Sequence, residues 1–323
     1  MSVPRVFPEI RISRDLLGGF TSPAHQTGPR VRDRSLVLLN RFHLLNKRRV
    51  GVTVLTSRLT ELLHSWIAPR VEAVALAWLD DRASAIATGD KKSLFLGFGM
   101  VPRKVGKADV TLSDVERSQA EVARPGWNPR GWSLDQLART FLVLSFPSEV
   151  AALYVQTLDQ LFQAGEVGEL VSLYQALPLL PNPASHTLRA AEGIRSNIKS
   201  VFCAVAHQNP YPAEQLNEEQ WNQLVLKCLF VDVPLDPLIG VDRRANAKLM
   251  TTLIDFAHER RAAHRPIPPD LWRCVGPFAD ERALDDLQLV LTTGEPSERR
   301  AAADALRRCP NPRAAAILAQ ANP

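Results

Sequence analysis

The sequence lacks the long hydrophobic run of a membrane-spanning helix, and it lacks paired cysteines. No stretch of the 323 residues approaches the roughly 18 consecutive apolar residues that such a helix needs. The basic N-terminus has no apolar block ending in a small-residue cleavage site, so it does not resemble a secretory signal. The four cysteines are scattered without CxxC spacing, which indicates neither a zinc site nor a redox motif. These absences predict a reduced, cytoplasmic protein without a transmembrane segment.

Short catalytic motifs are also missing. The chain has no GxSxG and no Walker A loop, and Gly97-Phe98-Gly99 lacks the third glycine and the preceding strand of a dinucleotide-binding loop. His258 and His264 are six residues apart, whereas a zinc protease helix needs two histidines four apart on one face. We interpret these two histidines as solvent-facing. We therefore predict no metal site, no cofactor and no enzymatic activity.

Apolar residues recur with the period of a helix, and no stretch alternates with the period of a strand. Residues 59–67, for example, place leucine, tryptophan and isoleucine at i, i+3, i+4, i+7 and i+8. Short alanine-rich helices follow one another after Asp280, as in stacked helix-pair repeats. The pattern predicts an all-α protein of stacked helical hairpins, an α-solenoid or HEAT-like fold with no substantial sheet.

Polar residues mark several helix starts. Ser113 with Glu116 and Ser133 with Gln136 form the S-x-x-E/Q pattern of a capping box, and Asn217 and Asn246 are suited to N-cap positions. We further expect one long helix over about 184–207 and a loop over 99–113.

Charge divides the chain unequally. Residues 1–51 hold ten Lys/Arg and three Asp/Glu, whereas the remainder holds 29 and 31. The near-neutral body argues against nucleic-acid binding, which needs a basic face. We predict three parts: 1–51, a basic and disordered extension or a misassigned start; 52–279, a helical domain; and 280–323, HEAT-like C-terminal helices.

Some charged residues lie beside apolar stripes. On the helix expected over 184–207, Arg195 falls close to the stripe, and Glu192 lies three residues before it, positioned to pair. On the helix expected after Asn246, Arg260 continues the apolar stripe. A charge in such a place is costly unless it is paired or meets a ligand.

Two interpretations of these charges stay open. In the structural one, the arginine stems lie along the stripes, their heads reach solvent, and neighbouring glutamates neutralise them. In the functional one, they form an anion-recognising pocket. Its candidate ligand-binding residues are Arg195, Glu192, Arg260, Arg243 and Lys227, with Trp221 and Tyr174 as apolar walls.

Long runs of the chain resemble the EboA-domain family of bacterial metabolite traffic proteins. The resemblance is continuous from about Leu55 to Phe278, and residues 1–51 depart from it. It is carried by the runs LGFGMVPRKVGKADVTLS, PGWNPRGWSLDQLART, LVSLYQALPLLPNP, RAAEGIRSNIKSVFCAVAHQNPYPA, WNQLVLKCLFVDVPL and GVDRRANAKLMTTLIDFAHERRAAHRPIPPDLW. The alanine-rich tail resembles the HEAT-like end seen in such proteins.

The resemblance implies a place in a system that moves a secondary-metabolite precursor from the cytoplasm toward the periplasm. It also implies partners from the same gene cluster, including a prenyltransferase of the UbiA type. It supplies no catalytic residues. Association with the inner face of the membrane through such partners is left open.

Three functions are compatible with these observations. The first is a non-catalytic component of metabolite export that binds the metabolite or a partner protein. The second is a HEAT-like scaffold that docks the prenyltransferase and its neighbours without a small ligand. The third and least favoured is an enzyme acting on a prenylated aromatic, because its candidate pair, Glu192 and His207, would lie about 22 Å apart along one helix.

Overall fold

Helices form the regular structure of the protein. The computed structural model describes residues 55–321, and the predicted extension 1–51 lies outside them. Within the described residues there is no strand, only two isolated bridges, Asp109 with Ser133 and His207 with Leu238. The predicted all-α class is confirmed.

The helices have the following bounds. A helix over 55–67 comes first. It is followed by α2 (Ala73–Ala87), α3 (Lys91–Lys104), α4 (Asp114–Ala123), α5 (Leu134–Leu144), α6 (Ala151–Ala164), α7 (Val167–Ala176), α8 (Thr187–Arg195), α9 (Lys199–Ala206), α10 (Tyr211–Gln215), α11 (Glu218–Phe230), α12 (Val241–Arg244), α13 (Ala247–Ala262), α14 (Leu271–Val275), α15 (Glu281–Thr293), α16 (Pro296–Arg307) and α17 (Pro312–Ala321). Short 3₁₀ turns link some of them, at Ala68–Arg70, Leu177–Leu179, Pro183–His186 and Gly276–Phe278.

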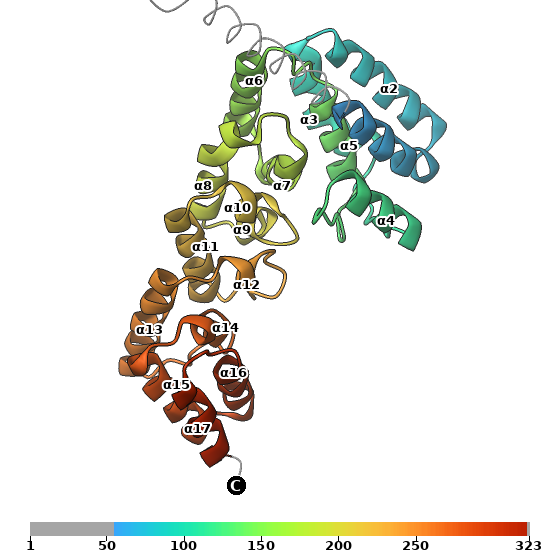
Figure 1. Cartoon of the computed structure of the whole chain (residues 1–323). Helices are drawn as coiled ribbons and strands as arrows, with labels where there is room; N and C mark the ends of the chain where they lie inside the picture. The colour runs from blue at the N-terminus through green and yellow to red at the C-terminus, as the bar shows by residue number, and fades with distance from the viewer. Residues whose placement is uncertain (1–54, 322–323) are drawn as a thin grey trace, which may run out of the picture. The chain divides into compact units, whose positions relative to one another are not determined.

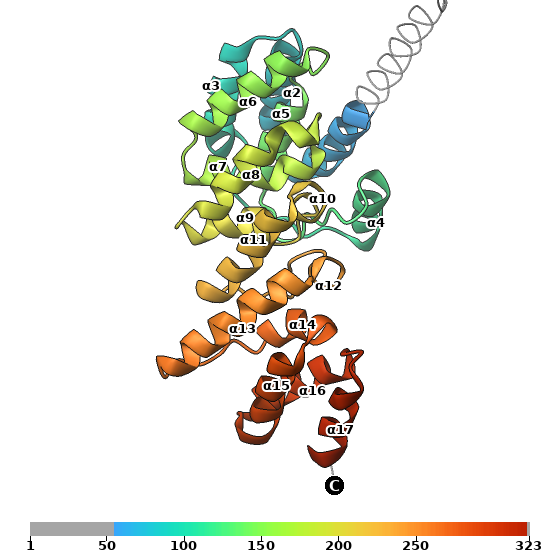
Figure 2. The same cartoon turned by 60° about the vertical axis from the view of Figure 1, so that its left-hand side comes forward.

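Neighbouring helices pack in succession along residues 55–321. α3 packs on α2 and α5, α7 on α5 and α9, α13 on α11 and α14, and α16 on α14, α15 and α17 (Figures 1 and 2). The described residues 55–321 fall within one compact unit by their contacts. The HEAT-like arrangement and the boundary at residue 280 stay predictions. No helix in the part of the chain described here is long and apolar enough to cross a membrane.

The predicted helix starts are well placed. The Ser113 hydroxyl accepts from the backbone N–H of Glu116, whose carboxylate accepts from the Ser113 N–H at 2.8 Å. The side chains of Asn217 and Asn246 each accept a hydrogen bond from the backbone N–H three residues later, at 2.8 Å. Each cap satisfies N–H groups that the first turn of a helix leaves free. Local sequence therefore determines where α4, α11 and α13 begin.

The predicted loop over 99–113 is partly wrong, because α3 continues through Pro102 to Lys104. A proline inside a helix removes the N–H that would bond the carbonyl four residues earlier, here Phe98. The buried Arg139 of α5 takes that place: its Nε donates to the Phe98 oxygen at 3.1 Å. A tertiary contact thus completes the helix that the local sequence would end.

The predicted long helix over 184–207 is also wrong. The chain forms a 3₁₀ turn, then α8, and breaks at 196–198 before α9. At the break, the Ser196 hydroxyl accepts from the N–H of Ile198 at 3.1 Å. Such a short-range bond competes with the helical pattern. The break lets α8 and α9 fold against each other.

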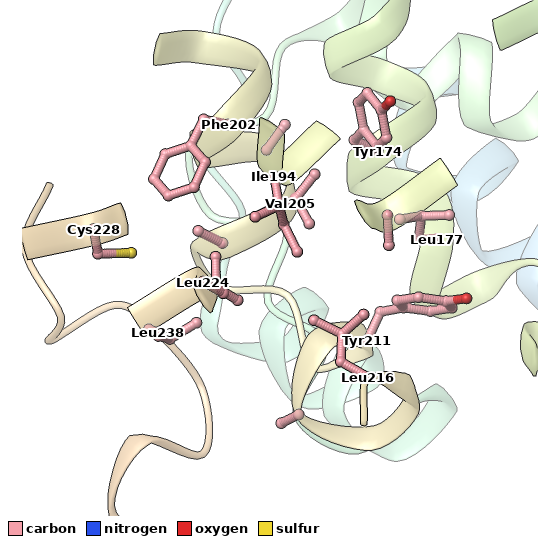
Figure 3. Close-up of a cluster of buried hydrophobic side chains, with 14 of the residues drawn as sticks. Tyr174, Leu177, Ile194, Phe202, Val205, Tyr211, Leu216, Leu224, Cys228 and Leu238 are labelled. Carbon is pink, nitrogen blue, oxygen red and sulfur yellow. The ribbon is translucent and has the colours of Figure 1, made fainter. Parts of the chain in front are cut away.

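Buried side chains from α7, α8, α9 and α11 meet in one cluster, shown in Figure 3. Tyr174, Ile194, Val205 and Leu224 are all at most 5% exposed. The close approach requires Gly193, where an added Cβ would lie 2.6 Å from Val205 and 2.7 Å from Tyr174. We call this cluster the α8–α11 core.

Candidate ligand-binding groove

Two loops that are distant in sequence enclose a groove of about 690 Å³. One loop follows α11, and the other follows α13. Arg260, on the last turns of α13, also lines it. We call it the Arg260 groove. Its lining residues are Cys228, Leu229, Phe230, Asp232, Val233, Pro234, Arg260, Pro266, Ile267, Pro268, Pro269 and Asp270.

The loop after α11 is bonded to Lys199 of α9 and to His207, the residue that follows α9. The imidazole Nε2 of His207 lies 3.0 Å from the Pro234 carbonyl oxygen, and it must donate because a carbonyl only accepts. Burial lowers the pKa of His207, so the ring is neutral at pH 7. The Lys199 ammonium donates to the Asp232 carbonyl at 3.3 Å. These bonds hold the groove's first wall in place.

The two walls are joined directly. The Asp270 carboxylate in the second loop accepts from the backbone N–H of Leu235 in the first, at 2.9 Å. The second loop starts where α13 ends, with His264 at φ +53° and the Arg265 N–H donating to the Arg260 carbonyl at 2.9 Å. That left-handed residue turns the chain back from the helix. The two walls are therefore held by hydrogen bonds in which a backbone group is at least one of the partners.

Arg260 is fixed at one end of its guanidinium group. Its Nε donates to the Pro266 carbonyl at 2.9 Å, and its charged group lies over the ring of Phe256, 5.7 Å from the centroid. The terminal Nη1 and Nη2 groups carry no hydrogen bond to any residue of the described range 55–321. No carboxylate within that range forms an ion pair with them. Arg260, a partly exposed residue, thus brings donors without a partner among residues 55–321 to a mainly apolar groove.

Tyr174, Glu192 and Arg195 lie near one another, but the two charged residues are at the surface and the Tyr174 ring is buried below them. Tyr174 is 4% exposed, whereas Glu192 and Arg195 are exposed. Burial raises the pKa of Tyr174 to about 12, and the charge of Glu192 adds to that. Glu192 forms its ion pair with Arg189 at 2.7 Å, and not with Arg195 as expected.

Trp221 on α11 is fully buried. Arg243 is exposed. Its neighbour Arg244 is the residue that stacks on the Trp221 ring, 4.9 Å from the centroid, and donates to three carbonyls that include Leu216 at 2.8 Å. Arg244, which is not among the candidate ligand-binding residues, therefore has a structural role: it joins α12 to the backbone around α10 and to the Trp221 ring.

Lys227 closes the end of α8. Its ammonium donates to the carbonyls of Ile194 at 2.6 Å and Ser196 at 2.8 Å, and lies 5.1 Å from the Phe202 ring centroid. Desolvation lowers the pKa of Lys227. Cations are favourable at helix C-termini because carbonyls point outward there. Lys227 thus holds α8 against α11.

His264 is exposed, as the sequence interpretation expected, and the His258 side chain is 38% exposed, but His258 also forms side-chain contacts that the sequence did not indicate. Its Nε2 donates to the buried Asp286 at 2.6 Å, and its Nδ1 accepts from Arg282 at 2.9 Å. Both ring nitrogens are therefore occupied by links between α13 and α15. No group of three or more potential metal ligands is found within the described residues.

Sequence reasoning found Arg260 through its place on the apolar stripe, but it missed the groove walls. One signal was present: prolines 266, 268 and 269 interrupt the chain after α13, as Pro234 does after α11. Prolines indicate loops that cannot extend a helix or strand. They do not indicate that two loops meet.

The family comparison covers most of the described chain. Residues 59–276 match the family model described as metabolite traffic protein EboA. That range includes the whole Arg260 groove and the α8–α11 core. No curated protein and no solved structure matches the chain.

Proposed function

The chain belongs to the EboA family of metabolite traffic proteins, and on this premise we propose that it is a non-catalytic carrier that binds a small metabolite in the Arg260 groove. The carrier works within a system that moves a secondary-metabolite precursor. The observation that carries the proposal is the groove itself, with its apolar walls and a guanidinium that has free donors.

The size and chemistry of the groove support a small ligand. Pockets for small molecules usually measure about 300–1,000 Å³ and combine apolar walls with a few polar groups. The Arg260 groove has a volume of about 690 Å³. At its edge, Phe230 is 68% exposed, which is costly for a phenyl ring unless a ligand or partner covers it.

The non-catalytic role is supported by the state of the groups that could do chemistry. His207 is engaged by the Pro234 carbonyl, and Glu192 by Arg189. The Cys228 thiol at the groove has its pKa raised to about 12 by burial, so it is not a thiolate nucleophile at pH 7.

Native mass spectrometry of the full chain, purified gently from its host, tests the proposal. The wild type should carry a small molecule of defined mass. Phe230→Ala should lose most of it, whereas Leu188→Ala should keep it, because Leu188 is also exposed (75%) but lies on α8 away from the groove. Equal retention of the small molecule by both variants would show that it does not bind in the Arg260 groove.

The second candidate is a scaffold that docks a UbiA-type membrane prenyltransferase and neighbouring proteins without a small ligand. Exposed apolar side chains toward the C-terminal end, Phe278 (40%) and Leu289 (43%), favour it. Leu289→Asp should then release partners from the complex. Removing residues 280–323 is a poorer test. Gly276 packs against the backbone of Ala305, so the deletion would expose buried residues of the remaining chain.

A further inference from the structure

We propose that the ligand of the Arg260 groove is a singly charged organic acid, whose apolar body lies between the two loops and whose anionic group meets the guanidinium of Arg260. This inference rests on the proposed function, because it names the chemical class of the metabolite carried there. It also assigns Arg260 as the residue that selects this class.

The geometry of the Arg260 guanidinium suits a planar anion. Arginine has five N–H donors in a rigid fork, and the two ends of that fork match the two oxygens of a carboxylate. Because Nε is bonded to Pro266, the plane of the fork is fixed and only Nη1 and Nη2 stay free within the described residues. A fixed fork loses little conformational entropy when an anion binds.

A ligand with more than one negative charge is disfavoured by the other charges of the groove. Asp232 and Asp270 also line it, so its formal balance with Arg260 is one positive charge against two negative ones. Neither carboxylate forms an ion pair with Arg260 among the described residues, so the cation is not neutralised by contact. A phosphate or diphosphate would meet more repulsion than attraction here.

The walls favour an apolar body over a sugar or peptide. Pro234, Pro266, Pro268 and Pro269 have no backbone N–H to donate, and Val233 and Ile267 present only hydrocarbon. A ligand rich in hydroxyls would lose most of its hydrogen bonds to water along these walls, where only Asp232 and Asp270 offer side-chain acceptors. An apolar ligand body has no such hydrogen bonds to lose and covers Phe230.

Two dyes with the same skeleton test the charge selection on the full chain. Anilinonaphthalene sulfonate carries one negative charge, and phenylnaphthylamine is its neutral counterpart. Arg260→Gln should weaken binding of the sulfonate about tenfold or more, because a hydrogen-bonded charge pair is lost. The neutral dye should be unaffected.

The controls separate charge selection from folding. Arg265→Gln removes an exposed arginine five residues away that does not line the groove, and should change neither affinity. Asp232→Asn should strengthen binding of the sulfonate and leave the neutral dye unchanged. Circular dichroism should show the same helix content in all three variants.

Failure of this inference can be told from failure of the carrier. If Arg260→Gln weakens both dyes equally or neither of them, while Phe230→Ala weakens both, the groove binds ligands without selecting acids and only the present inference is overturned. If neither dye responds to Arg260→Gln or to Phe230→Ala, the carrier proposal falls with it.

Discussion

Lys227 and Arg260 have similar positions on their helices but differ in how many of their N–H groups have a hydrogen-bond partner. Each is a half-buried cation near the C-terminal end of a helix with an apolar face, and each lies over an aromatic ring. Lys227 donates hydrogen bonds to two carbonyls, whereas Arg260 donates with only one of its five N–H groups, to a single carbonyl. A charge beside an apolar stripe therefore indicates a ligand site only when donors are left over.

The same contrast separates the two regions. The α8–α11 core is filled by side chains with little exposure, and its cations close helices. The Arg260 groove is walled by loops that are joined by a hydrogen bond from the Leu235 N–H to the Asp270 carboxylate but do not fill the space between them. Changes in the core should appear as lost stability, and changes in the groove as lost binding.

The largest expected effect is at Trp221, a buried residue of α11, the helix that also contributes Leu224 to the α8–α11 core. Trp221→Ala removes a fully buried indole and the surface on which Arg244 stacks. It should lower the free energy of unfolding by about 3–5 kcal/mol, as large-to-small changes in packed cores do. Urea unfolding followed by circular dichroism measures it. A loss below about 1 kcal/mol would contradict the division into a stability region and a binding region.

Substituting each cation by methionine tests the comparison directly. Lys227→Met leaves two carbonyls at the end of α8 without their donor, and should cost about 1–3 kcal/mol of stability. Arg260→Met loses one bond to a loop carbonyl that water can replace, and should cost less than about 1 kcal/mol. Thermal unfolding of both variants under the same conditions gives the ranking. The reverse order would mean that Arg260 is structural.

A smaller effect is expected at Arg70, whose two terminal guanidinium nitrogens both have carboxylate partners. Arg70 donates to both oxygens of Glu116, at 2.8 and 2.9 Å, and holds the pKa of Glu116 at about 2, below its ordinary 4.5. A lowered carboxyl pKa adds stability above pH 4.5, and that stability is lost as the pH falls toward 2. For a partly solvated pair we expect about 1 kcal/mol.

Glu116→Gln should reduce the acid-dependent part of the stability by that amount, as measured by melting temperature between neutral pH and pH about 3. Exposed Glu219 serves as the control. If Glu219→Gln changes the pH profile as much as Glu116→Gln does, the Arg70 pair is not the source.

Local residues predicted the fold class and several helix starts, because capping is a matter of three or four neighbouring residues. Ser113, Asn217 and Asn246 cap where expected. Local reasoning failed where a distant group decided the outcome: α3 passes Pro102 because Arg139, from another helix, bonds the carbonyl that the proline leaves free. It failed for a different reason at 196–198, where the Ser196 hydroxyl accepts from the Ile198 N–H: this contact is local, but a serine at that position is also compatible with a continuous helix.

The sequence by itself determined that the chain is helical, where its caps lie, that Arg260 falls on an apolar stripe, and that the chain resembles the EboA family. These follow from short-range periodicity and from the order of residues. Only the tertiary structure decided which cations are satisfied and that the loops after α11 and α13 meet across Asp270 and Leu235. Carbonyl partners and groove walls come from residues some 30 positions apart, and no local pattern encodes such a distance.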